Sequence, residues 1–117
     1  MTSDDNTALL AVDTTRSADG PVLKVVGELD LSTVDMLVEA GRVALAGPPE
    51  TLAVDMSGVD FCDSAGINGL VKLRNLGAEH DWTFRVINLR PHVRRVIADL
   101  TGLREFLGIS EEAGTPE

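Results

Sequence analysis

The chain has 117 residues, 44% hydrophobic and 3% aromatic, a length that fits one domain whose core needs neither disulfide bonds nor metal. Few aromatic residues and a net charge of −9 at pH 7 argue against a base-stacking surface and against contact with nucleic acid or an anionic membrane. The same charge favours a protein partner that offers a basic or apolar patch.

The first part of the folded region predicts a β-hairpin. Apolar residues predict strands at 8–14 and 22–29, and the turn formers of the sequence RSADGP lie between them. Polar ends at 1–7 and 111–117 are expected to be flexible, which leaves one domain at 8–110.

A helix and a third strand follow the hairpin. Apolar residues at helical spacing over 34–45 predict the helix, which Ser32 can cap with Asp35 three residues later in a capping-box arrangement. Glycine and two prolines then end it. The third strand starts at 51–56, and the sequence SGVD after it is either a turn or a bulge that continues the strand to Phe61.

The second half predicts two more strand-and-helix segments. Helical spacing is found over 64–78 and again from 91 until Gly102, with a strand at 83–89 between them. A last apolar patch at 103–109 is a strand or a short helix. The order ββαβαβα with a C-terminal tail predicts a small α/β domain, in which an antiparallel hairpin joins parallel strands in one mixed sheet packed with helices.

The sequence DSAG lies at the start of the second helix, at the carboxyl end of a central strand, where open α/β sheets commonly place their sites. Ser64 suits the N-cap of that helix. A phosphate there would face backbone amides and the positive end of the helix dipole, so the domain itself could tolerate it. Gly66 and Gly69 each lower helix propensity by about 1 kcal/mol, which suggests close approach to the sheet or to a partner.

The sequence lacks residues that an enzymatic role for these positions would require. A serine nucleophile at Ser64 would need the first glycine of G-x-S-x-G, which is absent, and a base, for which His80 and His92 read better as solvated surface residues. Asp55 falls mid-strand without the other residues of a phosphate-accepting receiver domain, and it reads better as a turn acceptor. No metal-binding, phosphate-cradling or dinucleotide motif is present, so we expect no enzyme activity, metal or cofactor.

The chain is expected to be cytoplasmic. The lone Cys62 cannot form an internal disulfide and reads as a small buried hydrophobic residue. The opening sequence MTSDDNT is not that of a signal peptide, and no apolar run approaches the ~18 residues of a transmembrane helix.

Two stretches, VVGELDLST and VDMSGVDFCDSAGINGLVKL, resemble the STAS domain family of anti-sigma factor antagonists. The similarity covers about residues 8–109, including the order of the elements. GELD alone is a weak signal, whereas the spaced string D-x-S-x-V-x-F-x-D-S-A-G is a strong one.

The resemblance implies a role for five residues. Ser64 matches the serine that is phosphorylated by a partner anti-sigma factor, a serine kinase with a histidine-kinase-like ATPase fold. Asp63 matches the acidic neighbour needed for recognition, and Asp30 an acidic residue in the loop after the second strand that faces the kinase. Ile67 and Asn68 match the exposed start of the second helix, where the kinase docks.

The resemblance also implies a partner switch in transcription regulation during a bacterial stress response. The unphosphorylated protein would bind the anti-sigma factor and release the sigma factor. Phosphorylation would end that binding, and a serine phosphatase would restore it. A second hypothesis is a stand-alone accessory subunit or scaffold of a transporter or stress-signalling complex, such as a small lipid-transport subunit.

Overall fold

The computed structural model describes residues 9–109, so the ends expected to be flexible, 1–7 and 111–117, lie outside the described residues. The elements follow the predicted ββαβαβα order. They are β1 (Leu10–Ser17), β2 (Gly20–Leu29), α1 (Val34–Ala44), β3 (Thr51–Cys62), α2 (Ser64–Ala78), β4 (Thr83–Ile87), α3 (Pro91–Arg94) and a π-helical turn, η2 (Arg95–Leu100).

The hairpin has a tighter turn than the sequence suggested. β1 and β2 pair antiparallel out to Ser17 and Gly20, which leaves a two-residue connection. The Ser17 hydroxyl accepts from the Asp19 amide and donates to the Gly20 carbonyl, so one side chain satisfies the backbone of the turn. Pro21 therefore lies within β2, opposite Arg16, rather than in the turn where we expected it.

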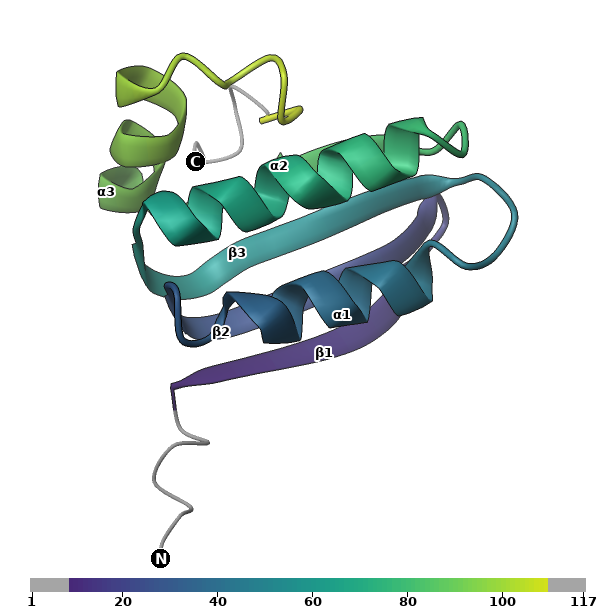
Figure 1. Cartoon of the computed structure of the whole chain (residues 1–117), viewed down its shortest axis with the longest axis horizontal. Coiled ribbons are helices and arrows are strands. Elements are labelled where there is room, and N and C mark those ends of the chain that lie inside the picture. The colour runs from purple at the N-terminus through teal and green to yellow at the C-terminus, as the bar shows by residue number, and fades with distance from the viewer. Residues whose placement is uncertain (1–8, 110–117) are drawn as a thin grey trace, which may run out of the picture.

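The four strands form one mixed sheet in the order β1-β2-β3-β4. β1 and β2 are antiparallel, whereas β2, β3 and β4 are parallel, as predicted. Helix α1 packs over β1 and β2, and α2 packs over β3 and β4, on the same side of the sheet (Figure 1). The result is a two-layer α/β domain in which α2 begins at the carboxyl end of the central strand β3.

Aliphatic side chains from the sheet, both long helices and the C-terminal part form the core. The largest fully buried ones are Leu23, Leu29, Leu37, Leu52, Met56, Leu70, Leu73, Ile97, Leu107, Val25, Val54 and Val59. Gly69 lets the helices meet, because a Cβ built on it would lie 2.3 Å from Val34 Cγ2 on α1. At this glycine the close approach is to helix α1, and not to the sheet or to a partner as the sequence suggested.

Strand β3 does not turn at the sequence SGVD. It continues to Cys62, and its register against β2 shifts between Lys24 and Val26 and again between Gly27 and Glu28. The bulge interpretation is therefore right. These irregularities let one long strand reach the edge of the sheet where α2 begins.

The C-terminal part is neither a continuous α-helix nor a strand. After α3, the η2 segment is a π-helix, and Gly102 follows with a φ of 74°. The patch at 103–109 forms hydrogen-bonded turns and then a single parallel bridge between Ile109 and Val86 of β4. The expected strand or short helix is thus reduced to one bridging residue, whose side chain, like that of Leu107, is buried in the core.

Candidate functional site

Ser64 is the first residue of α2, and its side chain is exposed. The sequence suggested that Ser64 is the N-cap of this helix, and this prediction is wrong. Asp63 caps the helix instead: its Oδ1 accepts from the amides of Ala65 at 3.0 Å and Gly66 at 3.1 Å. Within residues 9–109 the Ser64 hydroxyl forms no hydrogen bond. The structure thus separates a capping carboxylate from an adjacent free hydroxyl.

The start of α2 is locked to the end of β2. Cys62 pairs with Leu29 in the parallel register, and the next amide, that of Asp63, donates to the Leu29 carbonyl at 3.2 Å. Gly66 lies directly over this junction, since a Cβ there would be 2.7 Å from the Leu29 oxygen and 2.8 Å from Cys62 Sγ. This glycine is the close approach to the sheet that the sequence predicted, and it fixes where Ser64 is presented.

The loop from β2 to α1 lies at the same edge of the sheet. The Asp30 carboxylate accepts from the Ser32 amide at 3.0 Å and from the Ser32 hydroxyl at 2.8 Å. These bonds, the side-chain bond from Ser32 foremost, lower the pKa of Asp30, because they stabilise its ionised form. Since Leu29 is also bonded to Asp63, the two acidic residues Asp30 and Asp63 begin neighbouring connections at one edge.

The N-cap of α1 also differs from the prediction by one residue, in the opposite direction. Thr33, not Ser32, is the N-cap, and its side chain is buried. Its hydroxyl donates to the Glu28 carbonyl at 2.8 Å and accepts from the Asp30 amide at 3.0 Å. Thr33 therefore holds the β2–α1 loop in shape, a role that the sequence LDLST hinted at only through its adjacent hydroxyl residues.

The two residues expected on the exposed start of α2 differ. Asn68 is exposed, in agreement with the expectation. Ile67 is only 8% exposed and belongs to the core, so its side chain is unavailable to a partner. The helical period explains the difference, because Ile67 shares the sheet-facing side of α2 with Leu70.

Cys62 lies under this site and is inert. Its side chain is buried, which confirms the reading as a small hydrophobic residue. Burial, reinforced by the negative charge of Asp63, raises the pKa of the Cys62 thiol to about 12. The thiol therefore stays protonated at neutral pH and supplies no nucleophile.

Within residues 9–109, neither histidine nor Asp55 forms a hydrogen bond with the Ser64 hydroxyl. His80 follows the far end of α2, about 20 Å along the helix axis from Ser64 at 1.5 Å per residue. His92 is exposed, and its Nε2 lies 2.7 Å from the Asp60 carbonyl oxygen. Asp55 accepts from the Ser57 amide at 2.9 Å, but both residues lie within β3, so it is an acceptor inside the strand and not in the turn that the sequence suggested.

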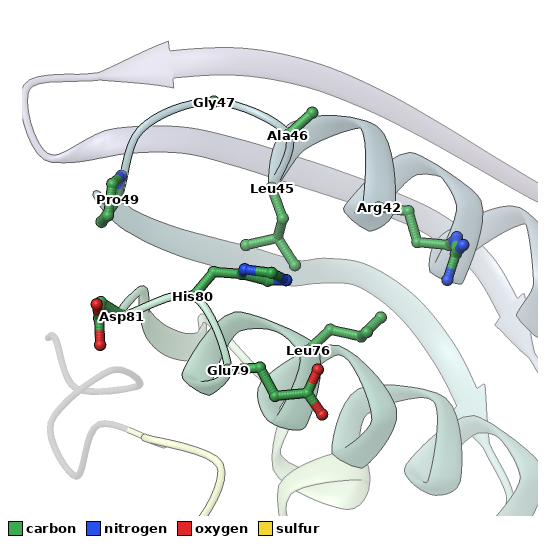
Figure 2. Close-up of a pocket in the computed structure, with 9 residues that line it drawn as sticks. All are labelled: Arg42, Leu45, Ala46, Gly47, Pro49, Leu76, Glu79, His80 and Asp81. Atoms are coloured by element: carbon green, nitrogen blue, oxygen red, sulfur yellow. The ribbon is translucent and has the colours of Figure 1, made fainter.

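A cavity of about 610 Å³ lies at the other end of the two helices, away from Ser64. Figure 2 shows Arg42 of α1 and Glu79 at its sides, with the His80 ring between Leu45 and Leu76. Across residues 9–109, no three His, Cys, Asp or Glu side chains are grouped so that they could hold a metal ion. None of the helices described there is long and apolar enough to span a membrane.

Comparison with known proteins adds a family to this geometry. The family model described as "Mlab, STAS domain" matches residues 12–108. No curated protein matches the chain in a sequence search.

Solved structures share the fold at low sequence identity. An anti-sigma factor antagonist from Mycobacterium paratuberculosis is 24% identical with a TM-score of 0.77, over 95% of this chain and 91% of that one. The phosphorylated form of the Bacillus cell fate determinant SpoIIAA is 20% identical with a TM-score of 0.63, over 87% and 93%. The murine anion transporter Slc26a9 is 20% identical with a TM-score of 0.68, over 81% of this chain but 16% of the transporter.

Proposed function

Since the chain belongs to the STAS domain family, we propose that it is an anti-sigma factor antagonist switched by phosphorylation of Ser64. The observation that carries the proposal is the exposed, unbonded hydroxyl of Ser64 at the start of α2. One fold neighbour, SpoIIAA of Bacillus, is described as an anti-sigma factor antagonist, and its structure is known in a phosphorylated form. The protein acts here as a substrate and binding partner, not as an enzyme.

The proposed reaction is carried out by the partner, an anti-sigma factor that is also a serine kinase. The Ser64 oxygen attacks the γ-phosphorus of ATP bound to the kinase, the bond to the β-phosphate oxygen breaks, ADP leaves, and the hydroxyl proton passes to a base of the kinase. A free hydroxyl suits this step, because no hydrogen bond within the domain has to be broken first. A serine phosphatase reverses it by hydrolysing the phosphate ester.

The switch follows from charge at the edge of the sheet. A phosphate adds about −1.5 to −2 charges at neutral pH. The amides of Ala65 and Gly66 are already bonded to Asp63, so the new charge lies beside an existing carboxylate rather than replacing it. A partner surface that closes over Ser64 would remove water from this added charge, which weakens binding. The fold itself is unaffected, because the phosphate lies outside the buried core.

Three further residues enter the proposed interface in different ways. Asp30 and Asn68 flank Ser64 from the β2–α1 loop and from α2, and they contact the partner directly. Asp63 both caps α2 and offers its charge to the partner. Ile67 supports the helix from the core and makes no contact with the partner, because its side chain is buried.

A second function is favoured by the names of two matches. The family model that covers the chain is described as Mlab, and one fold neighbour is the domain of an anion transporter. The same domain could serve as an accessory subunit of a transporter complex, with Ser64 as a contact residue. The two proposals differ in whether the hydroxyl is modified.

The test uses the purified protein with each histidine-kinase-like anti-sigma factor of the same organism and ATP. Intact-mass spectrometry should find one phosphate on the wild type, none on Ser64→Ala, and one on the control Ser57→Ala, which removes another exposed hydroxyl. In calorimetric titrations Ser64→Asp should raise the Kd at least tenfold, which is about 1.4 kcal/mol.

A phosphate mapped to another residue would contradict the switch, as would equal affinities of the wild type and Ser64→Asp. Recovery of a transporter ATPase subunit as the binding partner, with no phosphate on Ser64, would favour the accessory-subunit function.

A further inference from the structure

Leu31 is the most exposed of the large hydrophobic side chains within residues 9–109, at 79%. It lies in the β2–α1 loop between Asp30 and Ser32, where most side chains are polar. Single exposed hydrophobic residues are common on protein surfaces, so exposure alone decides nothing. Two further features distinguish this leucine: the loop that carries it is held in place, and it borders a groove beside Ser64.

Hydrogen bonds on both sides of Leu31 hold the loop. The Asp30 carboxylate accepts from the Ser32 amide and hydroxyl, and the buried Thr33 hydroxyl joins the Glu28 carbonyl to the Asp30 amide. The Thr33 and Val34 amides also donate to the Asp30 carbonyl, at 3.1 and 2.8 Å. Leu31 is thus presented in a preorganised loop, which reduces the entropy lost when it binds.

The groove beside Leu31 runs between the first turns of α1 and α2. It has a volume of about 220 Å³, and its lining includes Val34 and Val38 from α1 and Ala65 and Gly69 from α2. Pockets for small molecules and cofactors are usually about 300–1,000 Å³. The groove is therefore too small for a nucleotide and suits a single large side chain. Ala65, the residue after Ser64, is part of its lining.

We propose that this groove and Leu31 receive an apolar side chain from a basic surface of the anti-sigma factor, and that Leu31 is the main apolar anchor of the complex. The inference rests on the proposed function and names the chemistry of the partner at the same site. Phosphorylation of Ser64 then acts at the rim of the groove, where it changes the charge beside the inserted side chain.

Charge around the groove selects the partner. Asp30 and Asp63 begin the two connections that frame it, and Asp35 lines it directly. Lys72 lines the other end, about two helical turns from Ser64. With a net charge of −9 on the whole chain, a second copy would be repelled, whereas a basic surface around an apolar side chain is complementary.

The experiment measures the Kd between the anti-sigma factor that phosphorylates Ser64 and three variants of the protein. Leu31→Ser should raise the Kd at least tenfold, because it removes the anchor from an exposed position without touching the core. Val43→Ser is the matched control: it also removes an exposed aliphatic side chain of the α1 region, 68% exposed, but at the far end of the helix, and it should change the Kd less than twofold. Ser64→Asp reports on the switch itself.

Wild-type affinity in Leu31→Ser, together with weak binding by Ser64→Asp, would overturn the anchor and leave the proposed function standing. Failure of the wild type to bind or be phosphorylated by any such kinase would overturn both. Sedimentation analysis of the protein alone adds one more outcome: self-association that Leu31→Ser abolishes would assign the groove to a second copy and refute the assigned partner.

Discussion

Replacing Asp63 separates its two proposed roles, as a helix cap and as a charge recognised by the partner. In Asp63→Ala the amides of Ala65 and Gly66 lose their acceptor. In Asp63→Asn the side-chain oxygen can still accept both hydrogen bonds, but the negative charge is gone. Asparagine and aspartate are equally good N-caps, whereas alanine is a poor one.

The expected magnitudes follow from these contacts. Loss of the cap in Asp63→Ala should cost about 1–2 kcal/mol of unfolding free energy. Asp63→Asn should lose only the attraction between its charge and the helix dipole, about 0.3–1 kcal/mol. For a domain near this size, 1 kcal/mol corresponds to about 4 °C in Tm, so the alanine variant should melt about 4–8 °C below the wild type.

Thermal and urea unfolding followed by circular dichroism measure the cap, and titration with the kinase measures recognition. If the charge is recognised, Asp63→Asn should bind the kinase more weakly although its Tm stays close to that of the wild type. A wild-type Tm in Asp63→Ala, or an asparagine variant as unstable as the alanine variant, would refute the capping argument. Unchanged kinase affinity in Asp63→Asn would remove the recognition role and leave the cap.

Two other predictions concern the junction beneath Ser64. Gly66→Ala should lower the unfolding free energy by about 1–3 kcal/mol, because the new Cβ would meet the fixed Leu29 carbonyl oxygen at 2.7 Å. The control Gly47→Ala, where a Cβ would have no atom within 4 Å, should not lower the midpoint of urea unfolding. Equal midpoints for the two variants would contradict the close approach at Gly66. The folded-state pKa of Cys62, about 12, exceeds its ordinary value of 9.0, so burial of the thiol contributes its full stability below pH 9 and loses it as the pH rises from 9 towards 12. The wild type should therefore lose more unfolding free energy than Cys62→Val between pH 8 and pH 10, and parallel pH profiles would show that the thiol does not titrate as argued.

The order of elements was predictable because each one has a strong local signal. Alternating and helical apolar periods, with glycine and proline between them, were enough to predict a hairpin followed by strand-and-helix units, and the sheet has that mixed topology. Less was predictable where long-range contacts decide the outcome. The strand β3 continues through the sequence SGVD because β2 pairs with it, and the patch after Gly102 forms one bridge because only Ile109 reaches β4.

At the site, errors of one residue came from neighbouring residues with equal capping ability. Asp63 and Ser64 are both good N-caps, as are Ser32 and Thr33, so local preference does not choose between them. The pairing of β2 with β3 decides the first case, because the Asp63 backbone amide donates a hydrogen bond to the Leu29 carbonyl oxygen, which fixes Asp63 in place and leaves Ser64 free.

The sequence by itself determined the α/β class, the position of DSAG at the end of a central strand, and the resemblance to the STAS family. These depend on residue order and short-range periodicity, which the chain carries locally. Only the tertiary structure decided that Asp63 rather than Ser64 caps α2, that Ile67 is buried, and that Leu31 borders a groove beside Ser64. Each of these depends on which segments far apart in the chain are brought into contact, and a linear pattern does not contain that information.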